Sequence, residues 1–271
     1  MTKLLANKIL LTTLLVTILS LDMFSQIIKS RDDLKKFYDE YNVEGFFVLY
    51  DQNNNKYIFI NEPQFKKQFT PASTFKICNS LIGLETGVIK DENYVLAWDS
   101  VVRRIPEWNK SQDLKTAFKN STVWYYQELA RRVGGKQMKF WLDKANYGNA
   151  DTSGGIDQFW LEGGLRISAE QQINFLRRLH DNTLPFSQRS MDIVKKIMVA
   201  KESREYVVRA KTGWGFQDNM NIGWYVGFIE TNENVFYFAN CIQTKADIPD
   251  FGKARIEIVY QILKEIEVIN K

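Results

Sequence analysis

A serine and a lysine three residues apart could perform acyl transfer in this chain. Ser73 and Lys76 follow Thr70-Pro71, where a capping hydroxyl and a proline at the first helical position predict the start of a helix. This spacing places Ser73 and Lys76 on one helix face, with the hydroxyl near the positive end of the helix dipole. An amine beside the hydroxyl could remove its proton and make Ser73 a nucleophile.

Two further motifs support a catalytic role for Ser73 and Lys76. Ser121-Thr122-Val123 precedes a helical stretch at 124–133, and Lys211-Thr212-Gly213 is predicted to close a strand at 206–210. Ser-x-x-Lys is expected by chance about once in a chain of this size, but Lys-Thr-Gly only about 0.06 times. A cleft between the helix and the strand could hold a substrate carboxylate while Ser73 attacks. Ser-x-x-Lys and Lys-Thr-Gly occur together in penicillin-recognising enzymes.

The complete set of motifs resembles the class D β-lactamases, the oxacillinases. The motifs are, in chain order, Pro71-Ala72-Ser73-Thr74-Phe75-Lys76, Ser121-x-Val123, Tyr147-Gly148-Asn149, Trp160-Leu161-Glu162-Gly163 and Lys211-Thr212-Gly213. The resemblance extends from about residue 46 to residue 266, and no motif position departs from the family pattern. Cys78, next to the site, is the least standard residue. The resemblance implies hydrolysis of β-lactam antibiotics through a serine acyl-enzyme.

The resemblance also implies how the base is made. In the family the lysine that matches Lys76 reacts with CO₂ and becomes N6-carboxylysine, the general base. Only a neutral amine reacts in this way, and burial lowers a lysine pKa by up to several units. Val123 and Leu161 are expected to line the apolar pocket around it. The indole N–H of Trp160, which only donates, is expected to bind the carbamate.

The other implied roles concern the substrate. Ser121 and Lys211 are expected to relay a proton to the β-lactam nitrogen, and the backbone N–H of Ser73 to form an oxyanion hole with that of Trp214. Thr212 and Arg255 are expected to bind the substrate carboxylate. The implied substrate-binding set is Thr212, Gly213, Trp214 and Arg255. Tyr147 and Asn149 are expected to shape the floor of the site.

The histidine and cysteine content argues against other chemistries. A Ser-His-Asp triad or a zinc site would have to include His180, the single histidine, which is predicted to end a surface helix. No metal is therefore expected, and no cofactor other than CO₂ or bicarbonate for Lys76. Cys78 lies in an apolar helical pattern and is expected to be a buried free thiol. Whether Cys241 pairs with it stays open in the sequence.

The order of patterns predicts an α+β fold. Aromatic and β-branched runs at 46–50 and 57–60 predict a hairpin, and a charged helix-like segment precedes them at 31–41. Helical blocks fill the middle of the chain. Strand patterns then return at 206–210, 222–229 and 235–242, before an amphipathic helix at about 252–267.

This order is most simply explained by one antiparallel sheet flanked by the terminal helices, with an inserted helical lobe. We expect a single domain over 26–271. Its sheet lobe comprises about 26–65 and 202–271, and its helical lobe about 66–201.

The first 25 residues predict export. Lys3 and Lys8 precede an apolar run over 9–21, which is the layout of a signal peptide. At about thirteen residues the run is shorter than the roughly twenty that span a bilayer, although an N-terminal anchor is the alternative. We expect a periplasmic protein without stable membrane association after cleavage. The formal net charge of +4 is spread along the chain and does not favour nucleic-acid binding.

Two other classes of protein share part of the motif set. A β-lactam sensor is acylated but barely turned over; sensors tend to have Asn where this chain has Val123 and usually follow several membrane spans. A cell-wall transpeptidase shares Ser-x-x-Lys and Lys-Thr-Gly but has no need of a pocket formed by Trp160 and Val123. Turnover separates a β-lactamase from the sensor.

Overall fold

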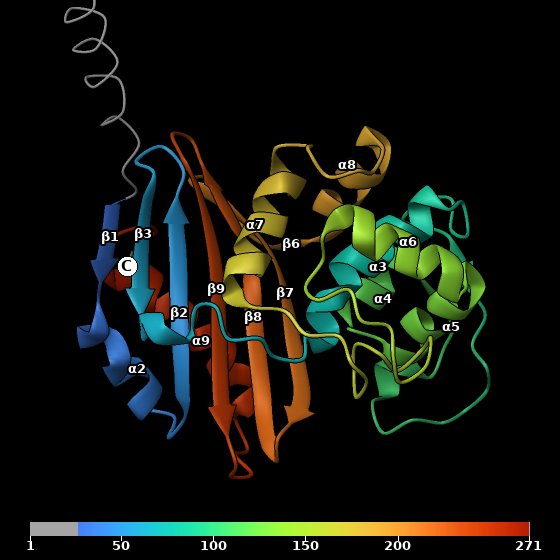
Figure 1. Ribbon diagram of the computed structural model, residues 1–271, viewed down its shortest axis with the longest axis horizontal. Helices are drawn as coiled ribbons and strands as arrows, with labels where there is room; N and C mark the ends of the chain where they lie inside the picture. Colours follow the sequence, from blue (N-terminus) through green and yellow to red (C-terminus); the bar gives the residue numbers. More distant parts are fainter. Residues whose placement is uncertain (1–26, 271) are drawn as a thin grey trace, which may run out of the picture.

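The computed structural model describes residues 27–270, so the predicted signal peptide at 1–25 lies outside the described residues. One seven-stranded sheet organises this part of the chain, in the order β1-β3-β2-β9-β8-β7-β6 (Figure 1). Its strands are β1 (Ile27–Ser30), β2 (Glu44–Asp51), β3 (Lys56–Ile60), β6 (Val199–Glu202), β7 (Tyr206–Gln217), β8 (Met220–Thr231) and β9 (Val235–Thr244). A separate small pair consists of β4 (Val95–Leu96) and β5 (Gln112–Asp113).

The sheet is antiparallel except at one edge. The hairpin of β2 and β3 forms as predicted, with Tyr50 opposite Tyr57, and β7, β8 and β9 follow one another as antiparallel neighbours. The prediction of a wholly antiparallel sheet is wrong at β1, which pairs in parallel with β3. All four β1 residues are exposed, so this strand is held by backbone pairing and has no buried face to predict it. The short edge strand β6 was also not predicted, and it lies within the range expected to be helical.

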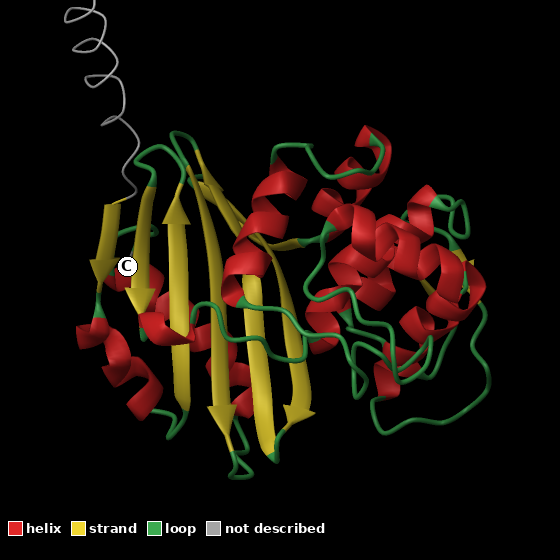
Figure 2. Cartoon of the chain, in the orientation of Figure 1, coloured by secondary structure: helices red, strands yellow, loops and turns green. Residues whose placement is uncertain are grey.

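Helices cover both faces of the sheet (Figure 2). The C-terminal helix α9 (Phe251–Glu265) packs with α2 (Lys36–Asp39) on one face, over an apolar cluster that includes Phe47, Phe238 and Ile258. The other face is covered by α7 (Ala169–His180), which comes from the middle of the chain. The terminal helices therefore flank the sheet as predicted, and both lie on the same face. The helix expected at 31–41 is also shorter, a 3-10 turn η1 (Asp32–Lys35) followed by α2.

The helical lobe is built around α3 (Lys76–Glu85). Residues 76–84 of this helix are all buried, so it passes through the lobe as a central rod. Around it lie α4 (Leu114–Lys119), α5 (Val123–Val133), α6 (Gly135–Ala145) and α8 (Gln188–Ile197), with 3-10 turns η2 (Glu62–Gln64), η3 (Ala72–Phe75) and η4 (Pro106–Trp108) in the connections. Within residues 27–270 no helix is both long and apolar enough to cross a membrane.

Candidate active site

The Ser-x-x-Lys pair lies where the 3-10 turn η3 runs into α3. Ser73 is half-buried in η3, and Lys76 is the first residue of α3. The predicted helix start is wrong in detail, because Pro71 precedes the helix and Thr70 does not cap it. The Thr70 hydroxyl donates instead to the carbonyls of Trp160 and Leu161, at 3.2 and 3.3 Å. Thr70 therefore links the turn that carries Ser73 to the segment that carries Trp160.

Two residues beside the reactive groups have strained backbones. Ala72, directly before Ser73, has a φ of 46°, and Ser121 has a φ of 52°. Residues other than glycine rarely adopt this left-handed backbone region, and those that do are often found at functional sites. Both strained positions lie within or next to the predicted motifs.

Lys76 is completely buried, and its Nζ lies 2.8 Å from the Oγ of Ser73. The ring of Tyr126 lies 5.1 Å below the same Nζ. Burial lowers the pKa of Lys76 to about 7, because the charged amine loses its hydration. A large fraction of Lys76 is therefore neutral near pH 7, and its neutral amine is in contact with the serine hydroxyl.

Lys211 approaches Ser121 from the sheet. Its buried Nζ donates to Ser121 Oγ at 3.1 Å and to the hydroxyl and carbonyl oxygens of Thr212 at 3.3 and 3.1 Å. The prediction that Lys-Thr-Gly ends a strand is wrong. The motif lies within β7, where Lys211 pairs with Val226. Burial lowers the pKa of Lys211 well below its usual value, and the nearby cations Lys76 and Arg255 lower it further.

Two glycines bring β7 against the turn of Ser73. A Cβ on Gly213 would lie 2.8 Å from the Pro71 carbonyl oxygen, and one on Gly215 would lie 2.9 Å from Cγ2 of Thr70. Residues two apart on a strand share a face, so these glycines open one side of β7 to η3. The sequence predicted that residues 215–221 border the cleft but gave Gly215 no role, although two glycines at this spacing in a strand indicate a close backbone approach.

Arg255 reaches β7 from α9. Its guanidinium donates to the Gly213 carbonyl and lies 5.9 Å from the ring of Trp214, which is 48% exposed. Its Nε is buried without a partner among the described residues. Burial lowers the Arg255 pKa to about 10, and the group stays cationic at neutral pH. The structure thus places the predicted substrate-binding residues of β7 and α9 together.

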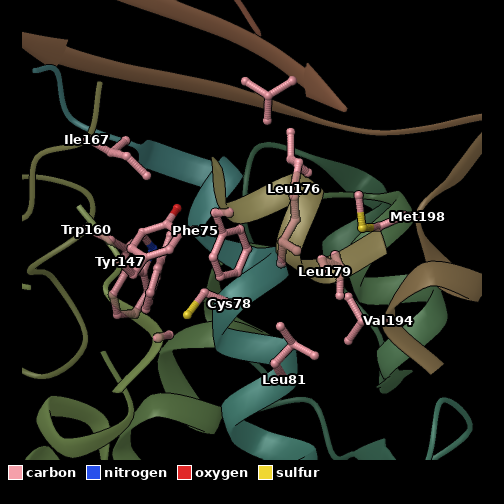
Figure 3. Close-up of a cluster of buried hydrophobic side chains, with 14 of the residues drawn as sticks. Phe75, Cys78, Leu81, Tyr147, Trp160, Ile167, Leu176, Leu179, Val194 and Met198 are labelled. Carbon is pink, nitrogen blue, oxygen red and sulfur yellow. The ribbon is translucent and has the colours of Figure 1, made fainter. Parts of the chain in front are cut away.

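An aromatic cluster forms around Phe75, the residue before Lys76. Trp160, Tyr147 and Phe75 gather beside α3, and the Cys78 thiol points toward them (Figure 3). The rings of Trp160 and Tyr147 lie 5.3 and 5.5 Å from that of Phe75, the residue before Lys76. The Trp160 Nε1 is buried and has no hydrogen-bond partner in the described part of the chain. Leu161 packs on this cluster.

Val123 is half-buried at the first position of α5. It follows directly on Ser121-Thr122, so the turn that presents the Ser121 hydroxyl also begins this helix.

Tyr-Gly-Asn holds the segment that carries Trp160. The Asn149 side chain donates to the Gly164 carbonyl at 2.9 Å and accepts from the Arg166 amide at 2.9 Å. Gly148 has a φ of 57°, and any Cβ there would collide with the Arg166 carbonyl. These contacts are structural, in line with the expectation that Tyr147 and Asn149 shape the site.

Comparisons with known proteins show which proteins this chain is similar to. The family model of the penicillin-binding protein transpeptidase domain matches residues 45–264. The chain is 43% identical to "Beta-lactamase OXA-48" of Klebsiella pneumoniae over 234 residues, which cover 86% of this chain and 87% of the relative. It is also similar to the crystal structure of the class D β-lactamase from Sebaldella termitidis, with 38% identity, a TM-score of 0.87, and coverage of 91% of this chain and 100% of that one.

The chain belongs to the class D β-lactamase family.

One similar protein is named as a regulatory protein and not as an enzyme. "Regulatory protein BlaR1" of Bacillus licheniformis is 36% identical over 233 residues, which cover 86% of this chain but only 38% of that protein. The α+β fold of this class D β-lactamase is the one predicted from the order of strand and helix patterns along the chain.

The remaining candidates from the sequence are His180, Cys78 and Cys241. His180 ends α7, as predicted, and its Nδ1 lies 3.0 Å both from Asp181 Oδ1 and from the hydroxyl of Tyr237. Cys78 and Cys241 are both free and buried. No group of three or more His, Cys, Asp or Glu side chains suited to a metal occurs in the described range 27–270.

Proposed function

We propose that this chain hydrolyses β-lactam antibiotics through an acyl-enzyme on Ser73. The observation that carries the proposal is the fully buried Lys76, whose pKa of about 7 and 2.8 Å contact with Ser73 Oγ suit it to generate a nucleophile. Ser73 attacks the ring carbonyl, and the C–N bond of the β-lactam breaks as its nitrogen receives a proton. Water then cleaves the ester and frees Ser73.

The cleft has a charge suited to an anionic substrate. Lys76, Lys211 and Arg255 are buried close together, and no carboxylate of the described residues forms an ion pair with any of them. Penicillins and cephalosporins carry a carboxylate beside the β-lactam ring. We propose that Thr212 and Arg255 bind this carboxylate, and that Gly213 and Trp214 form the adjacent strand edge.

Proton delivery to the leaving nitrogen is assigned to Ser121 and Lys211. The 3.1 Å contact between Lys211 Nζ and Ser121 Oγ gives the serine hydroxyl a donor that can replace the proton it gives away. The backbone N–H groups of Ser73 and Trp214 are proposed to stabilise the oxyanion. Ser121 itself lies in the turn directly before α5, with a φ of 52°.

Lys76 is proposed to be carboxylated by CO₂, and three observations fit this modification. About half of its amine is neutral at pH 7, the Trp160 Nε1 is a buried donor without a partner among the described residues, and no described carboxylate pairs with Lys76, Lys211 or Arg255. Leu161 and Val123 are proposed to complete the pocket. When formed, the carbamate would supply the base for both acylation and deacylation.

Replacing Ser73 with Ala tests the proposal. We expect wild type to hydrolyse a chromogenic cephalosporin with many turnovers, and Ser73→Ala to show none. After brief exposure to a penicillin, mass spectrometry should find an adduct on wild type only. An adduct that persists in Ser73→Ala would remove Ser73 from its role.

A β-lactam sensor is the second candidate, because the chain is similar to BlaR1. A sensor would give a stoichiometric burst and then stop, whereas a β-lactamase continues until the substrate is consumed. The same cephalosporin assay therefore decides between the two.

Export through residues 1–25 is proposed as well, from the basic start and short apolar run of that segment. N-terminal sequencing of the protein recovered from the periplasm should begin near residue 26. A start at Met1 in a membrane fraction would favour the anchor.

A further inference from the structure

We propose that Asn240, with Tyr38, is a positioning residue for Arg255 and thereby for recognition of the substrate carboxylate. This inference rests on the proposed function and adds two residues that lie outside every motif of the cleft. Both are buried, with 0% and 3% exposure.

Asn240 is a polar residue in an apolar row. It lies on β9, the central strand of the sheet, opposite Phe47 of β2 and Tyr225 of β8. Along β9 its same-face neighbours are Phe238 and Ile242, both part of the apolar cluster beneath α9. A buried amide at such a place costs free energy unless its hydrogen bonds are made.

Both ends of the Asn240 amide have a partner. Its Oδ1 accepts a 2.7 Å hydrogen bond from the Tyr38 hydroxyl, and its Nδ2 donates at 2.9 Å to the backbone carbonyl of Arg255. A glycine makes this chain possible, because a Cβ on Gly45 would collide with the Tyr38 ring. Tyr38 of α2 thus binds the Asn240 side chain, which in turn binds the backbone of α9.

The hydrogen bond from Asn240 binds the backbone of Arg255, whose side chain reaches β7. Arg255 is fixed from its backbone by Asn240, while its guanidinium meets the Gly213 carbonyl of β7. Arg255 has a long side chain, so a small shift or turn of α9 moves the guanidinium along the substrate-binding strand. The Tyr38–Asn240 pair therefore sets where Arg255 meets a carboxylate, although neither residue reaches the substrate.

The test is a double-mutant cycle of Asn240→Leu and Arg255→Ala. The readout is the second-order rate constant for acylation of Ser73 by a penicillin, which is defined whether or not the acyl-enzyme turns over. Asn240→Leu in the wild-type background should lower this constant about tenfold, a coupling of about 1.4 kcal/mol. In the Arg255→Ala background the same substitution should have no effect. The loss should appear in KM rather than in kcat.

A penicillin methyl ester provides a second readout that general destabilisation does not move. Wild type should discriminate between the acid and the ester, and Asn240→Leu should lose part of this discrimination, as Arg255→Ala does. Tyr38→Phe, which removes one hydroxyl and leaves the ring, should show the same pattern with a loss of about threefold. It keeps the test valid if Asn240→Leu folds poorly.

Tyr41→Phe is the matched control. The Tyr41 hydroxyl also joins the N-terminal segment to α9, through a 2.6 Å bond to Glu257 Oε2, but it does not contact Asn240. This variant should be acylated like wild type. Equal losses for Asn240→Leu in both backgrounds, or no loss in either, would overturn the inference while acylation of wild type leaves the proposed function intact. A wild-type chain that no β-lactam acylates would overturn the proposed function itself.

Discussion

Activity should depend on CO₂ in a way that changes with pH and with Trp160. The Lys76 pKa of about 7 lies far below the usual lysine value, so the neutral amine gains as pH rises through 7. About nine-tenths of Lys76 is then neutral at pH 8 and about one-tenth at pH 6. Because only the neutral amine reacts with CO₂, wild type should lose activity at pH 6 and recover it when bicarbonate is added. At pH 8 bicarbonate should have little effect.

Trp160→Phe should deepen this dependence. The substitution keeps a ring in the cluster with Phe75 but removes the buried Nε1 that has no other partner among the described residues. A hydrogen bond to a charged group contributes about 1.5–3 kcal/mol. The bicarbonate concentration for half-maximal activity should therefore rise about ten- to 150-fold. Deacylation should suffer more than acylation, so an acyl-enzyme should accumulate.

The assay is hydrolysis of a chromogenic cephalosporin at pH 6, 7 and 8, in CO₂-depleted buffer and with bicarbonate added in sealed vessels. NMR with ¹³C-labelled bicarbonate should show a carbamate signal that weakens in Trp160→Phe. Trp141→Phe is a matched control, because Trp141 Nε1 is also buried without a partner in the described part of the chain but lies in α6 against Phe186. Equal bicarbonate responses of wild type and Trp160→Phe would refute the role of Trp160. No response in either would mean that Lys76 acts as a plain amine.

Three further substitutions test the cleft. Lys211→Ala should lower kcat/KM by an amount that corresponds to about 2–4 kcal/mol of transition-state stabilisation, since the cation beside Ser121 and the substrate carboxylate is lost. An unchanged kcat/KM would mean that β7 does not line the site. Gly213→Ala should lower kcat/KM about 100-fold because its Cβ displaces the Ser73 turn, whereas Gly135→Ala, with nothing within 4 Å, should be silent; equal activities would refute the close approach. Thr70→Val should lower the free energy of unfolding by about 1–3 kcal/mol in denaturant titrations and raise the bicarbonate requirement, because the hydrogen bond to the Trp160 carbonyl is lost. Thr70→Ser should preserve both properties. A wild-type bicarbonate requirement in Thr70→Val would mean that Thr70 does not help to position Trp160.

The order of secondary structure could be predicted largely from local pattern. Runs of aromatic and β-branched residues indicated the hairpin of β2 and β3 and the strands β8 and β9, and β2, β8 and β9 are buried on both faces over most of their length. The helical spacing of apolar residues indicated α9. The strands β1 and β6 are exposed along their whole length, so no buried face leaves a pattern in their sequences. The length of β7 was also missed, because Lys211 and the glycines after it interrupt the apolar pattern where the strand meets the cleft.

The identities of the reactive residues followed from sequence, because Ser73 and Lys76 are neighbours on one turn and their contact is local. The contacts that join distant segments were decided by the tertiary structure. Ninety positions separate Lys211 from Ser121, and they meet only where β7 packs against the turn before α5. The close approach of β7 to η3 likewise depends on Gly213 and Gly215. The pKa of Lys76 likewise depends on the closed lobe around α3, since the same lysine on an open helix would be hydrated and charged. Sequence thus supplied the groups, and burial supplied their reactivity.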